Sequence, residues 1–580
     1  MQVQIKNLGP IEEAVLDLED ITVLIGPPNV GKSYTLKAIY SLLSPLDQIV
    51  QRRIIRQALQ EMFKPITLID DRELFEILTL LTIFYSARLR KVDELTDIVK
   101  QITNADIRIE EDDKNISINF KTTLNIDLNT MEELIREGAH AIIYEVLPVD
   151  EKTHVNIKEA LPLTILPELL KFLKSLENKP HVFTRATRDP ILEFEIREST
   201  GIGLEGNNLS LERNVILNFS KSSSLLVVLQ RGIEIKSVEC MLEKMKKMEQ
   251  QRISEYLLKH LTSLYPKSYY RRFYLRFHRI GRPFYKQVLD YLVDKIGRAL
   301  TRIYQDALEI RSVLFIPFGR SPLVYQLEEF TVTEPKYIWE AVLEYYKSNI
   351  ILYSYLSRLE RGRKAFSEGK YDDMIIKVFR PILQGDLWFD AQTRELRYRR
   401  WGFEELYKVR KQIDVSMKWA SALSSEVAGI FLPILDAPIN SCILIEEPES
   451  QLHPSAQILM ALGFVALSKL YRNKIVVSTH SDIFAYTLAC AKVLKLDKEK
   501  VLELIGRILE MQGIRAKDED IEALAEAASR DIDINVVFYY YEPTAKGVNV
   551  VKKTAQDIMS GVSGITEIID ILASWAMKIP

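Results

Sequence analysis

The chain has few cysteines. Its 580 residues hold three, Cys240, Cys442 and Cys490, and none of them forms a C-x-x-C pair. This scarcity excludes a disulfide framework and a cysteine zinc site, and it predicts a reducing compartment. The chain also lacks a strong charge of either sign, because 77 lysines and arginines face 80 acids and the net charge is −3. Any nucleic-acid surface must therefore be local.

Long apolar runs are absent as well. The two longest, Phe75–Tyr85 and Ile458–Leu467, are too short to span a bilayer and are typical of buried helices. The first residues, Met-Gln-Val-Gln-Ile-Lys, do not resemble a signal peptide. These absences predict a cytoplasmic protein with no membrane span. The length and the 47% of hydrophobic residues predict two to four ordinary globular domains.

One motif stands out against this background. Residues 26–33 read Gly-Pro-Pro-Asn-Val-Gly-Lys-Ser, a complete G-x-x-x-x-G-K-S phosphate loop. The apolar run Ile21–Ile25 before it predicts a strand, and the spacing of Tyr34–Leu43 after it predicts a helix whose N-terminus points at the phosphates. A chance match in a glycine turn is the alternative, which this context disfavours.

The residues of the loop have separable roles. Glycines let the backbone turn tightly and bring its N–H groups to the phosphates. Lys32 carries a positive charge to the β- and γ-phosphates, and the hydroxyl of Ser33 can ligate Mg²⁺. We therefore expect ATP and Mg²⁺ as cofactors, with the nucleotide bound by Gly26, Asn29, Gly31, Lys32 and Ser33.

A second strand followed by acids begins about four hundred residues later. Residues 441–454 read Ser-Cys-Ile-Leu-Ile-Glu-Glu-Pro-Glu-Ser-Gln-Leu-His-Pro, and Pro448 ends the apolar strand. We predict that Glu446 holds the metal and that Glu447 is catalytic and polarises the attacking water. The alternative is an acidic helix start, in which glutamate stabilises the helix N-terminus.

A third short strand, Lys474–Thr479, leads into His480 and Ser481. A lone histidine after a strand is usually structural. The order of these three elements, however, resembles the ABC-type ATPase heads of the SMC superfamily. Within that superfamily it is similar to the prokaryotic AAA-labelled, ABC-like ATPases and the OLD proteins. The resemblance implies that His480 is the catalytic switch histidine, which contacts the γ-phosphate.

The resemblance also implies a fold. It is an α/β ABC-type P-loop head, a mixed sheet plus an antiparallel sheet, with short helical insertions. Residues 5–11 look like its first strand and turn, and Ile316-Pro-Phe-Gly-Arg320-Ser321 resembles a strand–arginine motif of the same branch. The helical inserts are far too short for the coiled coils of SMC proteins. In this respect the chain resembles the coalescin-like SMC relatives of crenarchaea.

In this family two heads enclose two ATP molecules, so the resemblance implies an ATP-dependent homodimer. The signature motif of the partner would correspond to Ala422–Gly429, and Ser424 matches its serine, a hydroxyl donor for the γ-phosphate. Ser425 and Glu426 replace the usual glycines, and an acid near a phosphate is electrostatically unfavourable. His453 also departs from the family pattern, where SMC relatives have aspartate.

We predict five segments along the chain. They are an N-terminal lobe with the phosphate loop (1–235), a helical insertion with a basic aromatic tip (236–310), a return strand (311–335), a second helical insertion (336–384), and a C-terminal lobe with the signature-like motif, the acid pair and the histidine (385–580). Alternation predicts strands at 105–127, 192–198 and 213–235, which suit the antiparallel sheet of the head. Helices are expected at 46–102, 130–176, 237–264, 287–310 and 336–368.

Two basic clusters are candidate DNA surfaces. Residues 267–286 contain seven lysines or arginines, seven aromatic residues and no acid. The DNA-binding candidates there are Lys267, Arg271, Arg272, Arg276 and Arg279. The second cluster contains Arg394, Arg397, Arg399, Arg400, Lys408, Arg410 and Lys411. For each, the alternative is a helix with an aromatic core stripe and a basic outer face.

The leading functional hypothesis is an SMC-like ATPase that dimerises and acts on DNA in chromosome organisation or repair, in the cytoplasm and associated with the chromosome. Its rival is a defence or regulatory ATPase that gates a separate effector protein, an unidentified partner. A transporter subunit is disfavoured by the gap between the two halves of the site. A nuclease domain is disfavoured because Asp531-Ile-Asp533 opens a strand and has no partner glutamate, so we interpret it as a solvated strand start.

Overall fold

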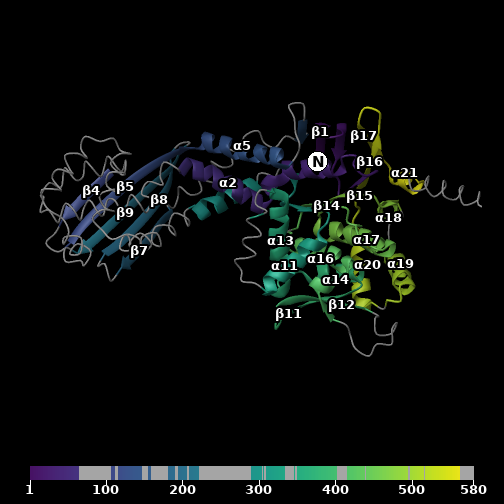
Figure 1. Cartoon of the computed structure of the whole chain (residues 1–580). Helices are drawn as coiled ribbons and strands as arrows, with labels where there is room; N and C mark the ends of the chain where they lie inside the picture. The colour runs from purple at the N-terminus through teal and green to yellow at the C-terminus, as the bar shows by residue number, and fades with distance from the viewer. Residues whose placement is uncertain are drawn as a thin grey trace, which may run out of the picture. The chain divides into compact units, whose positions relative to one another are not determined.

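The computed structural model describes residues 1–63, 106–111, 115–146, 154–157, 181–189, 194–205, 208–220, 289–302, 305, 308–333, 345, 349–401, 414–437, 439–493, 497–514 and 516–561. The chain divides into two compact units (Figure 1). The first unit contains residues 1–51, 139–163 and 300–580, and the second contains 52–138 and 164–299. The predicted N-terminal lobe, 1–235, is thus divided between the two units.

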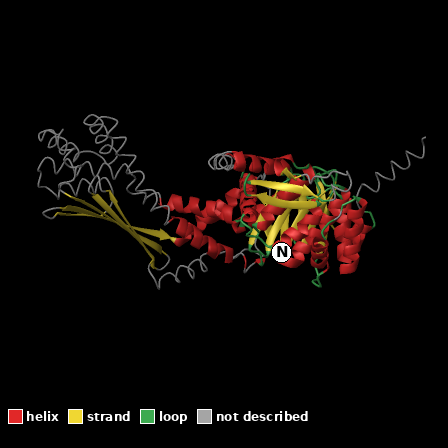
Figure 2. Cartoon of the chain, turned by 90° about the horizontal axis from the view of Figure 1, so that it is seen from below, coloured by secondary structure: helices red, strands yellow, loops and turns green. Residues whose placement is uncertain are grey.

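The described part of the first unit is built on a nine-stranded mixed sheet (Figure 2). Its strands, in order across the sheet, are β10 (Ser312–Ile316), β14 (Ser441–Glu446), β15 (Lys474–Thr479), β3 (Ile21–Ile25), β16 (Val536–Pro543), β17 (Val548–Lys553), β2 (Ile11–Asp17), β1 (Gln2–Leu8) and β6 (His154–Ile157). The first five are parallel to one another. The predicted strands before the phosphate loop, the acids and the histidine are all confirmed, as is the opening strand and turn.

The parallel strands are buried on both faces, which explains their nearly continuous apolar sequences. Ile21, Val23 and Ile25 of β3 belong to a core formed with helices on one face of the sheet. On the opposite face lies α1 (Lys32–Leu43), which contacts β10, β14 and β15. There the ring of Tyr40 packs edge-on against Phe315, with 5.5 Å between centroids. The helix after the phosphate loop is therefore held against the sheet by side-chain packing.

The large core on the other face is formed by helices from the second half of the chain. They are α11 (Ser321–Thr333), α13 (Ile350–Ser367), α14 (Asp373–Leu383), α16 (Ala422–Leu435), α17 (Pro454–Tyr471), α18 (Asp482–Val493), α19 (Lys498–Met511), α20 (Asp518–Ser529) and α21 (Ala555–Met559). Among the described helices, only α17 has the length and hydropathy of a membrane span, and 61% of it is buried. Its packing confirms that Ile458–Leu467 is a buried helix.

Two helices lie in the segment expected as a second insertion. α13 packs on α16, and α14 packs on α16, α17 and α20. Leu356, Leu359, Val378 and Phe379 are fully buried in the main core. This part of 336–384 is therefore integral to the first unit.

The described part of the second basic cluster forms a sheet, so the alternative of a helix with a basic outer face is wrong there. Its strands are β11 (Gly385–Asp390), β12 (Glu395–Arg400) and β13 (Asp414–Ser416), followed by the 3₁₀ turn η4 (Met417–Trp419). Arg399 donates to Asp414 at 2.6 and 2.8 Å, and the guanidinium of Arg397 lies 5.7 Å from the ring centroid of Trp388. These two cations are largely used within the fold. Lys408, Arg410 and Lys411 lie outside the described residues.

The second unit contains a five-stranded antiparallel sheet. Its order is β4 (Asp106–Glu111), β5 (Asn115–Asp127), β9 (Asn208–Ser220), β8 (Phe194–Glu205) and β7 (His181–Asp189). The strands expected at 105–127 and 192–198 are thus confirmed, but they belong to a unit of their own and not to the head sheet. The first unit supplies its own antiparallel part through β1, β2, β6 and β17.

Helices α2 (Gln48–Phe63) and α5 (Leu128–Val146) contain unit boundaries, and the short turn η1 (Ser44–Leu46) precedes α2. Residues 289–302 are helical, as expected for 287–310. The helix expected at 130–176 ends earlier, because residues 154–157 form β6. The helix expected at 237–264 lies outside the described residues. The predicted α/β class, with a mixed sheet and an additional antiparallel sheet, is confirmed.

The crossing of α13 and α16 makes a prediction. A Cβ built at Gly362 would lie 1.8 Å from the carbonyl oxygen of Leu432. We expect Gly362→Ala to lower the free energy of unfolding by about 1–3 kcal/mol, because the helices must separate. Chemical denaturation measures the change.

Gly506 in α19 is the matched control. A Cβ built there has no atom within 4 Å among the described residues. Gly506→Ala should raise stability by up to about 1 kcal/mol through helix propensity. Equal effects of the two substitutions would contradict the close crossing.

Candidate nucleotide-binding site

The phosphate loop connects β3 to α1, as predicted. Gly26 and Gly31 have φ angles of 148° and 96°, which favour glycine, and Asn29 has a φ of 62°. A Cβ at Gly26 would lie 2.9 Å from the carbonyl oxygen of Tyr541, and one at Gly31 would lie 2.8 Å from a side-chain carbon of Ile11. Both conformation and space therefore require glycine at the two positions.

Lys32 bends back over its own loop. Its Nζ donates to the carbonyl oxygens of Gly26 at 2.7 Å and Pro27 at 2.6 Å. The residue is only 5% exposed, and this burial lowers its pKa to about 8, although Glu447 and Glu449 oppose the shift. A buried ammonium group that donates to neutral carbonyl oxygens is poised to exchange them for phosphate oxygens, which carry negative charge.

The acid pair lies at the end of β14. Glu446 is 7% exposed, and its Oε2 accepts a hydrogen bond from the backbone N–H of Phe318 at 3.1 Å. Glu447 adopts a left-handed φ of 44°, and its N–H donates to the carbonyl oxygen of Ser478 at 2.9 Å. This turn directs the two carboxylates to different partners.

His480 connects the lysine to the second acid. Its Nε2 lies 3.4 Å from Oε1 of Glu447, and its Nδ1 lies 3.5 Å from Nζ of Lys32. Because the ammonium group can only donate, Nδ1 accepts and the ring proton lies on Nε2, facing the acid. The hydrogen bond from His480 is the main cause that lowers the pKa of Glu447. Lys32, His480 and Glu447 thus meet at the carboxyl ends of β3, β15 and β14.

Glu449 also belongs to this constellation, although the sequence analysis gave it no role. It is 9% exposed and accepts from the hydroxyl of Thr479 at 2.8 Å and from the N–H of His480 at 2.7 Å. Burial raises the pKa of its carboxyl group. Glu449 therefore fixes the backbone that carries the histidine. The sequence signal for this role was the position of Glu449 as the third acid of Glu-Glu-Pro-Glu. The turn at the proline brings its side chain back to the end of the strand.

A cavity of about 870 Å³ opens beside the acid. Glu447, Glu449 and His480 belong to its lining, together with residues of β3, α17, α18, β16 and α21. A cavity of this size can admit water and a small ligand to the face of Glu447.

The start of α16 departs from the predicted role of Ser424. Ser421 is the exposed N-cap, and its hydroxyl accepts from the N–H of Ser424 at 3.3 Å. Ser424 itself is fully buried, which is at odds with its predicted donation to a phosphate of a second chain. The periodicity explains the difference, because three residues after the cap the helix faces the core.

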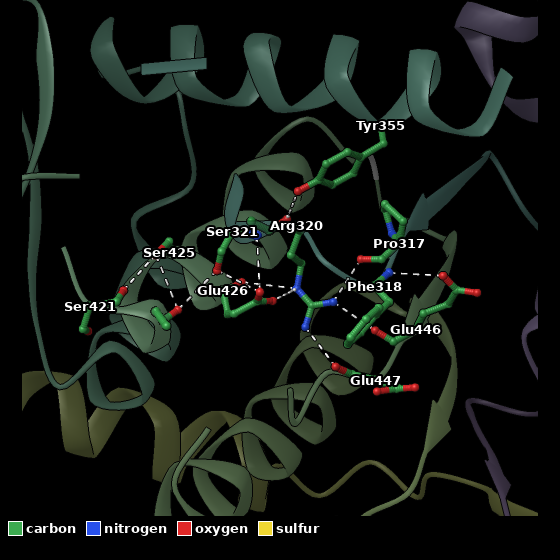
Figure 3. A network of polar contacts seen from close by, with 12 residues as sticks. Pro317, Phe318, Arg320, Ser321, Tyr355, Ser421, Ser425, Glu426, Glu446 and Glu447 are labelled. Carbon is green, nitrogen blue, oxygen red and sulfur yellow. Dashed lines mark hydrogen bonds and ion pairs between the residues drawn. The ribbon is translucent and has the colours of Figure 1, made fainter. Parts of the chain in front are cut away.

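Glu426 is also turned inward. It is 3% exposed and forms an ion pair with the fully buried Arg320 at 2.9 Å. Its other oxygen accepts from the hydroxyl of Ser321 at 2.8 Å (Figure 3). The expected repulsion between Glu426 and a phosphate therefore does not arise in this arrangement.

His453 and the D-x-D motif have structural positions. His453 is the N-cap of α17, and its side chain accepts from the N–H of Ser455, as an aspartate would do there. Asp531 and Asp533 are exposed just before β16, which confirms the interpretation of a solvated strand start. The DNA-binding candidates Lys267, Arg271, Arg272, Arg276 and Arg279 lie outside the described residues.

The donors present fit a nucleotide with Mg²⁺. Exposed Ser33 and Asn29, the loop glycines and Lys32 suit phosphate oxygens, and Ser33 with Glu446 offers oxygen ligands. Among the described residues, no group of three or more His, Cys, Asp or Glu side chains could hold a metal ion by itself. This donor set suits Mg²⁺, which usually completes its shell with water and substrate phosphates.

The loop, the acids and the histidine lie together at the carboxyl ends of neighbouring parallel strands, which is the arrangement of a P-loop ATPase domain. A family model described as AAA ATPase domain matches residues 1–306 and 436–485, more than half of the chain. The chain belongs to this family, which confirms the predicted AAA-labelled ATPase membership.

Other comparisons are more distant. No curated protein matches the chain. Among solved structures, it matches an SMC head bound to the C-terminal winged-helix domain of ScpA, with 10% identity, 96% of this chain and 98% of that chain covered, and a TM-score of 0.27. The SMC head domain from Thermotoga maritima matches with 9% identity, coverage of 95% and 98%, and a TM-score of 0.24. A ScpA-bound Smc head with an extended coiled coil from Pyrococcus furiosus matches with 10% identity, coverage of 98% of each chain, and a TM-score of 0.24.

The position of Lys32 makes a prediction about binding. We expect Lys32→Met to weaken ATP binding at least about 30-fold, because a charge-assisted contact to phosphate is lost. Fluorescence titration with a labelled ATP analogue measures the dissociation constant. Lys37→Met removes the same charge from the same helix and should change the constant by less than about threefold. Similar losses in both variants would show that only the overall charge matters.

Proposed function

We propose that this chain binds ATP with Mg²⁺ and hydrolyses it, that two chains dimerise around the nucleotide, and that the dimer acts on DNA. One observation carries the proposal. Lys32, His480 and Glu447 come from three neighbouring strands and form a chain of contacts, 3.5 Å and 3.4 Å long, across the end of the phosphate loop. This order of cation, histidine and acid suits hydrolysis of a terminal phosphate.

Each residue has a defined task in the proposal. Lys32 releases the carbonyl oxygens of Gly26 and Pro27 and binds phosphate oxygens. Ser33 and Glu446 would hold Mg²⁺, which neutralises phosphate charge when it is bound. Glu447 orients the attacking water and accepts its proton, and the lowered pKa of its carboxyl group keeps it ionised, and so available as an acceptor, at neutral pH. His480, with its proton on Nε2, holds Glu447 in place until a phosphate is present.

The exposed end of α16 supports the proposed dimerisation. The hydroxyl of Ser421 and the N–H groups at the exposed start of this helix suit an anion. Beside it, Trp419 is 76% exposed, and Phe318 next to Glu446 is 55% exposed. Large exposed apolar groups at a candidate site are typical of an interface. We infer that Ser421, in place of the buried Ser424, faces the nucleotide of the second chain.

A variant that binds but does not hydrolyse tests both steps. Glu447→Gln should lower the ATP turnover number at least about 100-fold, because a general base is removed. Its affinity for ATP should stay within about threefold of the wild type, because the phosphate contacts remain. Addition of ATP should convert this variant from monomer to dimer in sedimentation velocity.

Two further substitutions in that background locate the interface. Trp419→Ser should weaken the ATP-dependent dimer at least about tenfold, as expected for an interface aromatic residue. Met511→Ser, at a side chain that is 87% exposed at the end of α19, is the matched control and should leave the dimer unchanged. Turnover in Glu447→Gln close to the wild-type rate would refute the catalytic assignment. A dimer insensitive to Trp419→Ser would refute the assigned interface.

The DNA step is supported by the sequence of residues 267–286, which combines cations with aromatic residues. We expect duplex DNA to bind with a steep salt dependence. Replacement of Arg271, Arg272 and Arg276 by glutamate should reduce the slope of log K against log salt by about 2–3, since each phosphate contact contributes about 0.9. Mobility-shift titrations with and without ATP measure the slope.

The control reverses three exposed cations of α19, namely Lys498, Lys500 and Arg507, and thereby changes the net charge equally. An unchanged slope after reversal at 271, 272 and 276 would refute the basic tip as the DNA surface. Absence of DNA binding in the wild type would instead favour the alternative, an ATPase that gates a separate effector protein.

A further inference from the structure

A buried arginine lies directly behind the acid pair. Arg320 follows β10 in the turn Pro317–Arg320, and none of its side chain is exposed to solvent. We propose that Arg320 is a positioning residue for ATP hydrolysis, which holds the backbone of Glu446 and Glu447 and ties it to the first turns of α16. This inference deepens the proposed function and rests on it.

The guanidinium supplies hydrogen bonds to β14 beyond the point where its ladder with β10 ends. β10 pairs with β14 only as far as Ile316 and Ile445, because Pro317 has no N–H to continue the ladder. Beyond that point, Nη1 of Arg320 donates to the carbonyl oxygen of Glu446 at 2.9 Å. Nη2 donates to that of Glu447 at 3.0 Å. The planar fork of arginine can serve both carbonyls at once, which a lysine cannot do with the same geometry.

The conformation of Glu447 depends on such support. A φ of 44° is strained in a residue other than glycine and persists only where neighbouring groups hold it in place. Here the Ser478 carbonyl holds the N–H of Glu447, and Arg320 holds its carbonyl oxygen. Between these two hydrogen bonds, the side chain is directed to His480. Loss of the guanidinium would leave the Glu447 carbonyl oxygen with one remaining hydrogen bond, from the N–H of Ser450 at 3.1 Å.

The same arginine also reaches α16. Its Nε forms the 2.9 Å ion pair with Glu426, which lies five residues after the exposed cap Ser421 (Figure 3). Gly429, one turn further along α16, leaves room for the arginine stem, because a Cβ there would lie 3.0 Å from Cγ of Arg320. The hydroxyl of Tyr355 donates to the Gly429 carbonyl at 3.1 Å and closes this side. One side chain therefore contacts the acid pair and the helix that we propose faces the partner.

A set of three variants separates positioning from charge burial. Arg320→Met alone would leave Glu426 buried without its partner and could unfold the chain. Arg320→Met combined with Glu426→Gln removes both charges and approximates their volumes. Glu426→Gln alone keeps the arginine and its carbonyl contacts. Arg320→Lys keeps the charge but not the fork.

We expect the double variant to fold, with a cooperative thermal transition, and to bind an ATP analogue within about threefold of the wild-type affinity. Its turnover number should fall at least about 30-fold, which corresponds to loss of orientation of Glu447. Glu426→Gln should stay within about threefold of the wild-type turnover, and Arg320→Lys should fall at least about tenfold.

Hydrogen exchange supplies a readout that does not depend on hydrolysis. In the double variant and in Arg320→Lys, the peptide that covers Glu446–Ser450 should exchange faster than in Glu426→Gln, because the turn is released. Wild-type turnover and unchanged exchange in Arg320→Lys would overturn the proposal. This criterion does not need the double variant, so it holds even if that variant does not fold. If the wild-type chain does not hydrolyse ATP, the proposed hydrolysis is refuted. Faster exchange in the Arg320 variants would in that case still uphold the role of Arg320 in the turn.

Discussion

The site depends on the parallel alignment of β10, β14, β15 and β3. Parallel neighbours end at the same edge of the sheet, so whatever follows each strand must meet there. The residues that meet are the phosphate loop after β3, the acids after β14, and the histidine after β15. The phosphate loop and the acids lie about four hundred residues apart in the chain, and at the ends of these strands His480 bridges them, 3.5 Å from Lys32 and 3.4 Å from Glu447. The apolar cores on both faces of the sheet hold the carboxyl ends of these strands in fixed positions relative to one another.

Features that depend on local sequence were predictable. The loop at 26–33 needs glycines at two positions, and the structure gives a physical reason for each in the carbonyl of Tyr541 and the side chain of Ile11. The strands before Glu446 and His480 were readable from short apolar runs ended by polar residues. The antiparallel strands at 105–127 were readable from alternation, but their separate unit was not. Alternation of apolar and polar residues indicates that one face of a sheet is covered, but it does not indicate which element covers it.

Features that depend on how elements pack were not predictable from the sequence. Ser424 was assigned by motif position, but the cap at Ser421 sets the phase of the helix and turns Ser424 into the core. Glu426 was judged by its charge alone, although its partner, Arg320, lies 106 positions earlier in the chain. Helices α13 and α14 were assigned to an insertion because nothing local indicates that they pack on α16 and α17. Each case required knowledge of a contact distant in sequence.

The departure of the α16 motif from the glycine-rich family pattern has a physical explanation in this fold. A buried guanidinium that serves the carbonyls of Glu446 and Glu447 is costly without a counter-charge, because desolvation of an ion exceeds what neutral acceptors return. Glu426 supplies that counter-charge from the neighbouring helix, and its other carboxylate oxygen accepts from the N–H and the hydroxyl of Ser321. Each charge offsets the desolvation of the other, so Glu426 and Arg320 form one buried ion pair. The acid that looked incompatible with a phosphate at the sequence level is therefore the group that allows an arginine to stand behind the acid pair.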